Sequence, residues 1–195
     1  MRKLLLSIPV LLLVATAPVM AQCDLSPGFN HAVTVMEGNF QVTIGSIQET
    51  YAQGSIIEFE VVTTNIGTVS ETISWPVGIP DALFVTSSDC ADVFLCIDDI
   101  LFSYPPWQYY IPGSETLAPG ECRRAAMTWD TTIDPAPAGH YIAWGGLFAW
   151  TTDPGVNPLG EWILPANGVI LPTTISSTVG AEAACWDQIK AHYHR

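Results

Sequence analysis

The chain has 195 residues, of which 49% are hydrophobic, and 19 acidic residues against six lysines and arginines give it a formal net charge of −13. So negative a surface repels phosphate backbones and anionic lipids, which argues against nucleic-acid and membrane-surface partners. The length suits one domain of about 150 residues with a leader and a tail.

Residues 1–21 have the layout of a secretory signal peptide. A short basic start precedes an apolar run, and a Val-Met-Ala ending predicts cleavage after Ala21. Pro9 and Pro18 interrupt the run, which is shorter than the roughly 20 residues of a membrane-spanning helix. No later segment is apolar for long enough either. We expect an exported protein that is secreted, periplasmic or on the cell surface.

Alternation of apolar and polar residues dominates from residue 40 onward, in the runs 40–44, 57–63, 69–75 and 125–129. Each run has the pattern of a strand with one buried face and one wet face, and Glu58 and Glu60 are expected on a wet face. Fifteen prolines and fifteen glycines lie mostly between the runs. Residues 22–179 are therefore predicted to form an all-β antiparallel β-sandwich.

Two local signals join strands in the second half of this domain. Residues 118–121, Ala-Pro-Gly-Glu, predict a type II turn, because Pro119 presets the first central position and Gly120 accepts the positive φ of the second. Gly139-x-Tyr141 follows the next turn. It resembles a tyrosine corner, in which the tyrosine hydroxyl bonds back to the backbone.

Five cysteines remain after the predicted cleavage: Cys23, Cys90, Cys96, Cys122 and Cys185. In an exported chain they predict disulfides with one thiol left over. The pairing stays open among many arrangements. The local pair Cys90–Cys96 is the favoured one.

Acidic residues gather around this predicted pair, at Asp89, Asp92, Asp98 and Asp99. Calcium prefers converging carboxylate oxygens, so these four are its candidate ligands. Their spacing lacks the alternate acids and central glycine of an EF-hand. The favoured interpretation is a solvated acidic loop without a metal.

The stretch 103–113, Ser-Tyr-Pro-Pro-Trp-Gln-Tyr-Tyr-Ile-Pro-Gly, carries the candidate partner-binding residues Tyr104, Trp107, Tyr109 and Tyr110. Two prolines stiffen it, and aromatic loops on a rigid sandwich commonly form binding surfaces. The alternative is that it caps the open end of the sandwich. Trp75, Trp129 and Trp144 are in phase with the core faces of strands, whereas Trp107, Trp150 and Trp162 are expected in loops.

No catalytic residue and no cofactor is predicted. The histidines are His31, His140, His192 and His194, and no nucleophile motif such as G-x-S-x-G accompanies them. Arg123 and Arg124 lie side by side in a predicted strand, so alternation sends them to opposite faces. We expect both to be countercharges to nearby acids, with the small effect on stability of surface ion pairs.

Residues 180–195 differ in kind from the domain. Trp186, Ile189 and Tyr193 follow helical spacing, which predicts a short helical tail after a linker at residues 176–178. A frayed end and a docking or sorting tail both remain open.

The segments VVTTNIG, FVTSSDCADVF, TLAPGECRRAAMTWD and PAGHYIAWGGL, in this order, resemble the bacterial intracellular proteinase inhibitor family, BsuPI, over residues 51–148. The resemblance implies an immunoglobulin-like sandwich and a protein partner such as a protease. The matching positions look like framework residues: Asn65, Leu117, Pro119, Gly120, Glu121, Trp129, Gly139 and Tyr141.

These observations predict an exported, non-enzymatic, proteinase-inhibitor-like binding module. The alternative is a cell-surface structural or adhesion protein that carries a C-terminal sorting tail. A hydrolase using loop carboxylates is the third interpretation.

Overall fold

The structure, a computed structural model, describes residues 23–75, 81–88, 90, 99–104, 112–133, 135–149 and 161–177. Within these ranges the chain forms β-strands and no α-helix. The strands are β1 (His31–Glu37), β2 (Phe40–Ser46), β3 (Thr50–Ala52), β4 (Ile56–Asn65), β5 (Glu71–Trp75), β6 (Asp81–Ser87), β7 (Phe102–Tyr104), β8 (Gly113–Leu117), β9 (Cys122–Asp130), β10 (Gly139–Ala149) and β11 (Glu161–Ser176).

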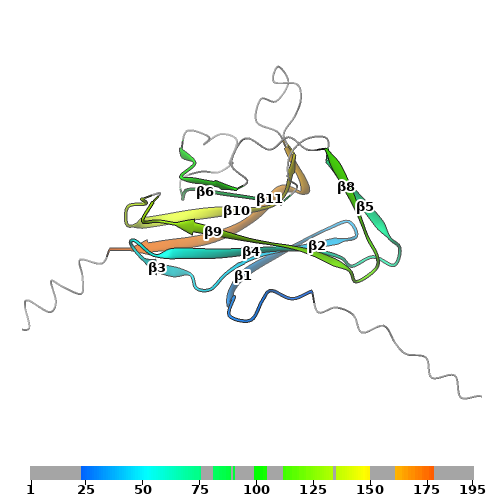
Figure 1. The fold of residues 1–195 in the computed structure, drawn as a ribbon, viewed down its shortest axis with the longest axis horizontal. Coiled ribbons are helices and arrows are strands. Elements are labelled where there is room, and N and C mark those ends of the chain that lie inside the picture. Colours follow the sequence, from blue (N-terminus) through cyan, green and yellow to red (C-terminus); the bar gives the residue numbers. More distant parts are fainter. Residues whose placement is uncertain are drawn as a thin grey trace, which may run out of the picture.

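The strands form two large sheets and one small one. The four-stranded sheet has the order β1-β2-β4-β9, the five-stranded sheet has the order β3-β11-β10-β6-β7, and β5 pairs with β8. All pairings are antiparallel except that of β3 with β11. The two large sheets lie as layers, and β5 and β8 stand at one end of them (Figure 1). The predicted all-β sandwich is confirmed.

The strand order is that of an immunoglobulin-like sandwich. Strands β2, β4 and β9 take the places of strands A, B and E, while β6, β10 and β11 take those of C, F and G. Strand β7 extends the second sheet beside β6, and β3 crosses over to run parallel to β11.

The main core lies between the two large sheets. The predicted inward faces of β2, β4 and β9 are confirmed, and they include the fully buried Ile44, Phe59 and Trp129. In β4 the outward residues from Glu60 onward are buried as well. Burying each such side chain contributes roughly 1.5–3 kcal/mol. Alternation fails at Val69, which is 58% exposed and precedes β5.

A second apolar cluster covers the outer face of the five-stranded sheet. Trp144 is buried there, with its indole N–H donating to Thr86 Oγ1 at 2.9 Å. The expectation that Trp162 lies in a loop is wrong, because it belongs to β11 and its ring packs edge-on against Phe84 and Phe148. The sheet therefore buries both faces. This explains why β10 is apolar almost throughout.

Both predicted strand connections are confirmed. Gly120 has a φ of 75°, and the Glu121 N–H donates to Ala118 O at 2.9 Å across the turn between β8 and β9. The Tyr141 hydroxyl donates to Pro137 O at 2.5 Å, four residues upstream, as a tyrosine corner requires.

At the ends of the chain, the predicted linker is wrong at its first residue, whereas the signal peptide and the helical tail stay predictions. Ser176 is not part of a linker, since it pairs with Ala52 as the last residue of β11. The predicted signal peptide, residues 1–21, and the predicted helical tail, residues 180–195, lie outside the described residues. In the part of the chain that is described, no helix has the length and apolar character to cross a membrane.

Candidate functional site

Three connections leave the sandwich at the same end, which we call the loop end. Strands β5, β7 and β10 finish there, and β6, β8 and β11 begin there. The pairs Leu83–Tyr104, Asp81–Leu147 and Ala149–Glu161 place these ends of β6, β7, β10 and β11 together. The pair Trp75–Gly113 joins the end of β5 to the start of β8, and Arg123 contacts both Trp75 and Asp81. The described strand ends that flank residues 76–80, 105–111 and 150–160 therefore lie at the loop end. In immunoglobulin variable domains, loops at the corresponding end bind ligands.

Arg123 joins all three sheets at the loop end. It extends from β9 and donates from Nε and Nη2 to the two carboxylate oxygens of Asp81 in β6, at 3.1 and 2.5 Å. Its Nη1 donates to Glu115 in β8. Its guanidinium also lies over the Trp75 ring of β5, 5.5 Å from the ring centroid. One side chain thus fixes the small β5–β8 sheet to both layers.

The Arg123 ion pair is buried, which corrects the expectation of a weak surface pair. The side chains of Arg123 and Asp81 are 14% and 9% exposed. Bidentate arginine–carboxylate pairs are directional and strong. Removing one partner of a buried pair leaves the other charge without compensation, which makes the loss far larger than at a surface.

Asn65 fixes the neighbouring turns. Its side-chain amide donates to Val69 O and Leu117 O, both at 2.8 Å, and its Oδ1 accepts from the Gly67 N–H. Its backbone carbonyl accepts from the Gly120 N–H at 2.8 Å. A fully buried side chain thus holds the β4–β5 connection and the β8–β9 turn together. Asn65 therefore has a framework role in this fold.

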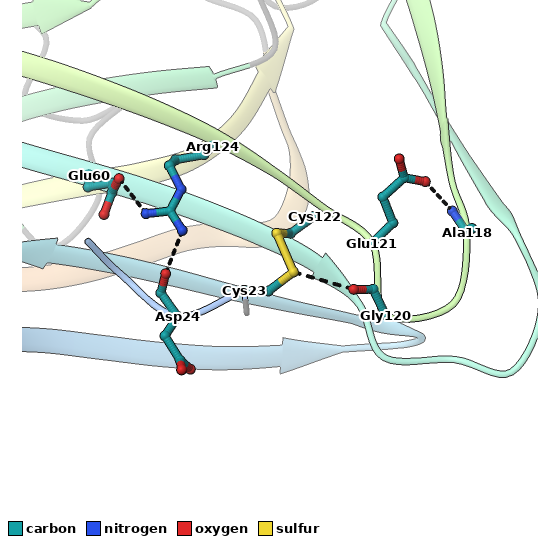
Figure 2. Close-up of a disulfide and its surroundings, with 8 residues drawn as sticks. All are labelled: Cys23, Asp24, Glu60, Ala118, Gly120, Glu121, Cys122 and Arg124. Carbon is teal, nitrogen blue, oxygen red and sulfur yellow. Dashed lines mark hydrogen bonds and ion pairs between the residues drawn. A yellow bond between two sulfur atoms is a disulfide. The ribbon is translucent and has the colours of Figure 1, made fainter. Parts of the chain in front are cut away.

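The N-terminal segment, residues 23–30, crosses the outward face of the four-stranded sheet, and we call it the strap. A disulfide joins Cys23 to Cys122, the first residue of β9, with a Cα–Cα distance of 5.8 Å (Figure 2). Cys90 is disulfide-bonded as well. The favoured partner of Cys90, Cys96, lies outside the described residues, so that pairing stays a prediction.

The strap buries a carboxylate that was expected to face water. The Ser26 N–H and hydroxyl donate to Glu60 at 2.6 and 2.9 Å, and the Glu60 side chain is only 3% exposed. Arg124 donates to Glu60 Oε1 at 2.7 Å, to Ser26 Oγ at 2.9 Å and to Asp24 O at 2.6 Å. The placement of Glu60 on a wet face is wrong because the strap covers that part of the sheet.

These contacts set the protonation of Glu60. Burial raises its pKa, but the hydrogen bond from the Ser26 backbone and those from Arg124 and the Ser26 hydroxyl lower it by more. The net result is a pKa below its ordinary value, so Glu60 is a stable anion at neutral pH.

Arg124 and Arg123 lie on opposite faces of β9, as alternation predicts.

Gly45 makes room for the strap. It pairs with Glu60 across β2 and β4, and a Cβ atom at this glycine would overlap Leu25 Cδ1. Leu25 therefore rests directly on the β2 backbone. A hollow of about 260 Å³ remains beside it, lined by Asp24, Leu25, Ser26, Pro27 and Arg124.

One of the four sequence-predicted partner-binding residues, Tyr104, lies within the described part of the chain. Tyr104 ends β7 at the loop end, where it is half-buried against the main core. Trp107, Tyr109 and Tyr110 lie outside the described residues. The position of Tyr104 nevertheless shows that the aromatic stretch begins at the loop end.

The candidate calcium ligands and the histidines do not form a described site. Asp99 is exposed, whereas Asp89, Asp92 and Asp98 lie outside the described residues. No cluster of potential metal ligands occurs among the residues that the structure describes. His31 Nε2 lies 2.6 Å from Pro172 O, and His140 Nδ1 lies 3.1 Å from Thr174 Oγ1, so both bind β11.

No protein-family model and no curated protein sequence matches the chain. Solved structures with some similarity include the CARDB domain of PF1109 from Pyrococcus furiosus. Its solution structure has 14% identity and a TM-score of 0.36, covering 71% of this chain and 94% of that domain. Its crystal structure in complex with di-metal ions has 14% identity and a TM-score of 0.33, covering 77% and 93%.

A β-glucosidase from Listeria innocua in complex with isofagomine has 9% identity and a TM-score of 0.39. The match covers 70% of this chain but 16% of the glucosidase. Similarities this low carry no argument about function. The fold assignment rests on the strand order itself.

Proposed function

We propose that the chain is an exported, non-enzymatic binding module that contacts a protein partner through its loop end. The observation that carries this proposal is the convergence of three connections on one end of a rigid frame. The aromatic stretch 104–110 belongs to one of them. Binding residues are commonly placed on loops that a rigid scaffold positions.

The contacts of Arg123 support this role. They hold Trp75 at the end of β5 and Asp81 at the start of β6, which flank one of the three connections, and pre-organised loops lose less entropy on binding. The Cys23–Cys122 disulfide supports export, because such bonds persist in oxidising compartments. A protease is the partner class that the resemblance to the BsuPI family favours.

The test is inhibition of trypsin-like, chymotrypsin-like and subtilisin-like serine proteases by the purified protein at micromolar concentration. We expect at least one protease to be slowed. The variant Trp107→Ala should weaken that inhibition at least tenfold, because aromatic anchors dominate protein interfaces.

Ile133→Ala is the matched control. Ile133 is 74% exposed and lies between β9 and β10, at the opposite end of the sandwich, so inhibition should not change. Failure to slow any of the proteases would contradict the protease partner. Equal losses in both variants would contradict the loop end as the contact surface.

The alternative, a cell-surface structural or adhesion protein, depends on residues 180–195 as a sorting tail. Deleting these residues and measuring cell association tests it directly. Unchanged retention at the surface would contradict the alternative.

A further inference from the structure

The strap is held to the sheet without any strand pairing. Residues 23–30 precede β1 and belong to no strand. Their attachments to the outward face of the sheet include the disulfide to the start of β9, the contacts of Glu60 and Arg124, and the packing of Leu25 on Gly45. Cleavage after Ala21, as the leader predicts, would leave Cys23 as the second residue of the mature chain. The disulfide would then be the covalent fastening of a free end.

We propose that the Cys23–Cys122 disulfide is a redox latch, and that its reduction by a dithiol releases the strap while the sandwich stays folded. The strap rests on the outward side of β2, β4 and β9 only. The inward side chains of the same strands, including Val42, Phe59 and Met127, are buried against the second sheet. Release therefore uncovers Glu60 and Arg124 without opening the main core.

The latch is accessible to a reductant, unlike the other described disulfide cysteine. Cys23 and Cys122 are both half-buried, and Cys122 follows directly on the β8–β9 turn at the edge of the sandwich. Cys90 is 3% exposed within the second apolar cluster. Because thiol–disulfide exchange requires access to a sulfur atom, a dithiol reaches the latch sulfurs more readily than the Cys90 sulfur.

The exchange is balanced by the dithiol alone. One thiolate of the reductant attacks a sulfur of the Cys23–Cys122 bond, that bond breaks, and a mixed disulfide forms while the other cysteine leaves as a thiolate. The second thiol of the reductant resolves the mixed disulfide. The reductant ends as a disulfide, and Cys23 and Cys122 end as two thiols after protonation.

The experiment follows amide hydrogen exchange of the full mature chain, with and without dithiothreitol and in the absence of denaturant. The Ser26 amide reports on the strap because it donates to Glu60. The paired amides of β2 and β4 report on the sandwich. Alkylation followed by peptide mapping shows which cysteines have been reduced.

With Cys23 and Cys122 alkylated and Cys90 intact, we expect exchange at Ser26 to accelerate at least tenfold while exchange in β2 and β4 stays slow. Unchanged protection of Ser26 in that state would overturn the proposal, since the strap would then be held without the latch. Loss of protection in β2 and β4 together with Ser26 would also overturn it, because the bond would then support the whole fold. Reduction of Cys90 before the latch would contradict the predicted order of access.

A variant without either thiol separates reduction from other effects of the reagent. Cys23→Ser combined with Cys122→Ser should show the fast Ser26 exchange with no dithiothreitol present. If this variant fails to fold during production, the reduced native chain still decides the question, because it is folded before the reductant is added.

Discussion

Two adjacent arginines hold two regions of this protein in different ways. Arg123 joins three sheets at the loop end through non-covalent contacts with the buried Asp81, with Glu115 and with Trp75. Arg124, on the other face of β9, binds a strap that a disulfide also fastens. A strap without strand pairing needs a covalent bond. The loop end does not, because each of these partners of Arg123 belongs to a strand that is itself paired.

The largest expected effect comes from removing the covalent fastening. Cys23 and Cys122 are 99 residues apart, and opening a loop of about this length costs about 4.7 kcal/mol of unfolding free energy in the chain-entropy model. Urea unfolding of the Cys23→Ser, Cys122→Ser variant measures the loss. A loss below about 1 kcal/mol would show that the unfolded chain is already restricted around this loop.

Arg123→Met should lower the unfolding free energy by about 3 kcal/mol or more, because the buried Asp81 carboxylate loses its partner. Urea unfolding measures this effect as well. The control is the double variant with Asp81→Leu, which removes both charges and should recover much of the loss. If the single and double variants are equally unstable, packing and not charge is what Arg123 supplies.

The strap also differs from the sandwich in how far the sequence predicts it. The sandwich follows from local signals: alternation places Phe59 and Trp129 inside, Pro119 and Gly120 specify the turn between β8 and β9, and Gly139 with Tyr141 specifies the corner. The strap follows from none of these. It depends on contacts between residues that are far apart in the chain.

Glu60 shows why the strap could not be predicted from the sequence. Its alternation with Phe59 and Val61 is the normal sign of a solvent-facing residue, and nothing local distinguishes it from the exposed Glu58. The available hint was Gly45, a glycine inside a strand, which often marks a close approach by another segment. Trp162 escaped for a similar reason, because proline and glycine residues on both sides suggested a loop although β11 continues through Pro165 and Gly168.

The pH dependence of stability should distinguish the strap from an exposed carboxylate. Because the pKa of Glu60 is lowered in the folded state, its stabilising contribution is present above its ordinary value of 4.5 and is lost as the pH falls through the folded pKa. Glu60→Gln should therefore flatten the decline in unfolding free energy below about pH 4.5. Thermal unfolding across pH 3 to 7 measures it.

Asp130 provides the matched control for this experiment. The pKa of this carboxyl is also lowered, by hydrogen bonds from Thr132, and it lies at the far end of β9 from the disulfide. Asp130→Asn should flatten the curve equally with and without the Cys23–Cys122 bond. The effect of Glu60→Gln should shrink once the strap is released. Equal behaviour of the two variants would mean that Glu60 does not report on the strap.

The smallest expected loss of unfolding free energy comes from replacing each arginine with lysine, which compares the two arginines directly. Arg124→Lys should cost about 1 kcal/mol or less, because the Arg124 side chain is 34% exposed and a lysine can keep the ion pair with Glu60. Arg123→Lys should cost more, since an ammonium group cannot reproduce the paired hydrogen bonds to Asp81 or the stacking on Trp75. Urea unfolding of both variants gives the difference. Equal losses of unfolding free energy would show that Arg123 contributes only its charge and not its hydrogen-bond geometry. The two arginines would then hold the loop end and the strap in the same way.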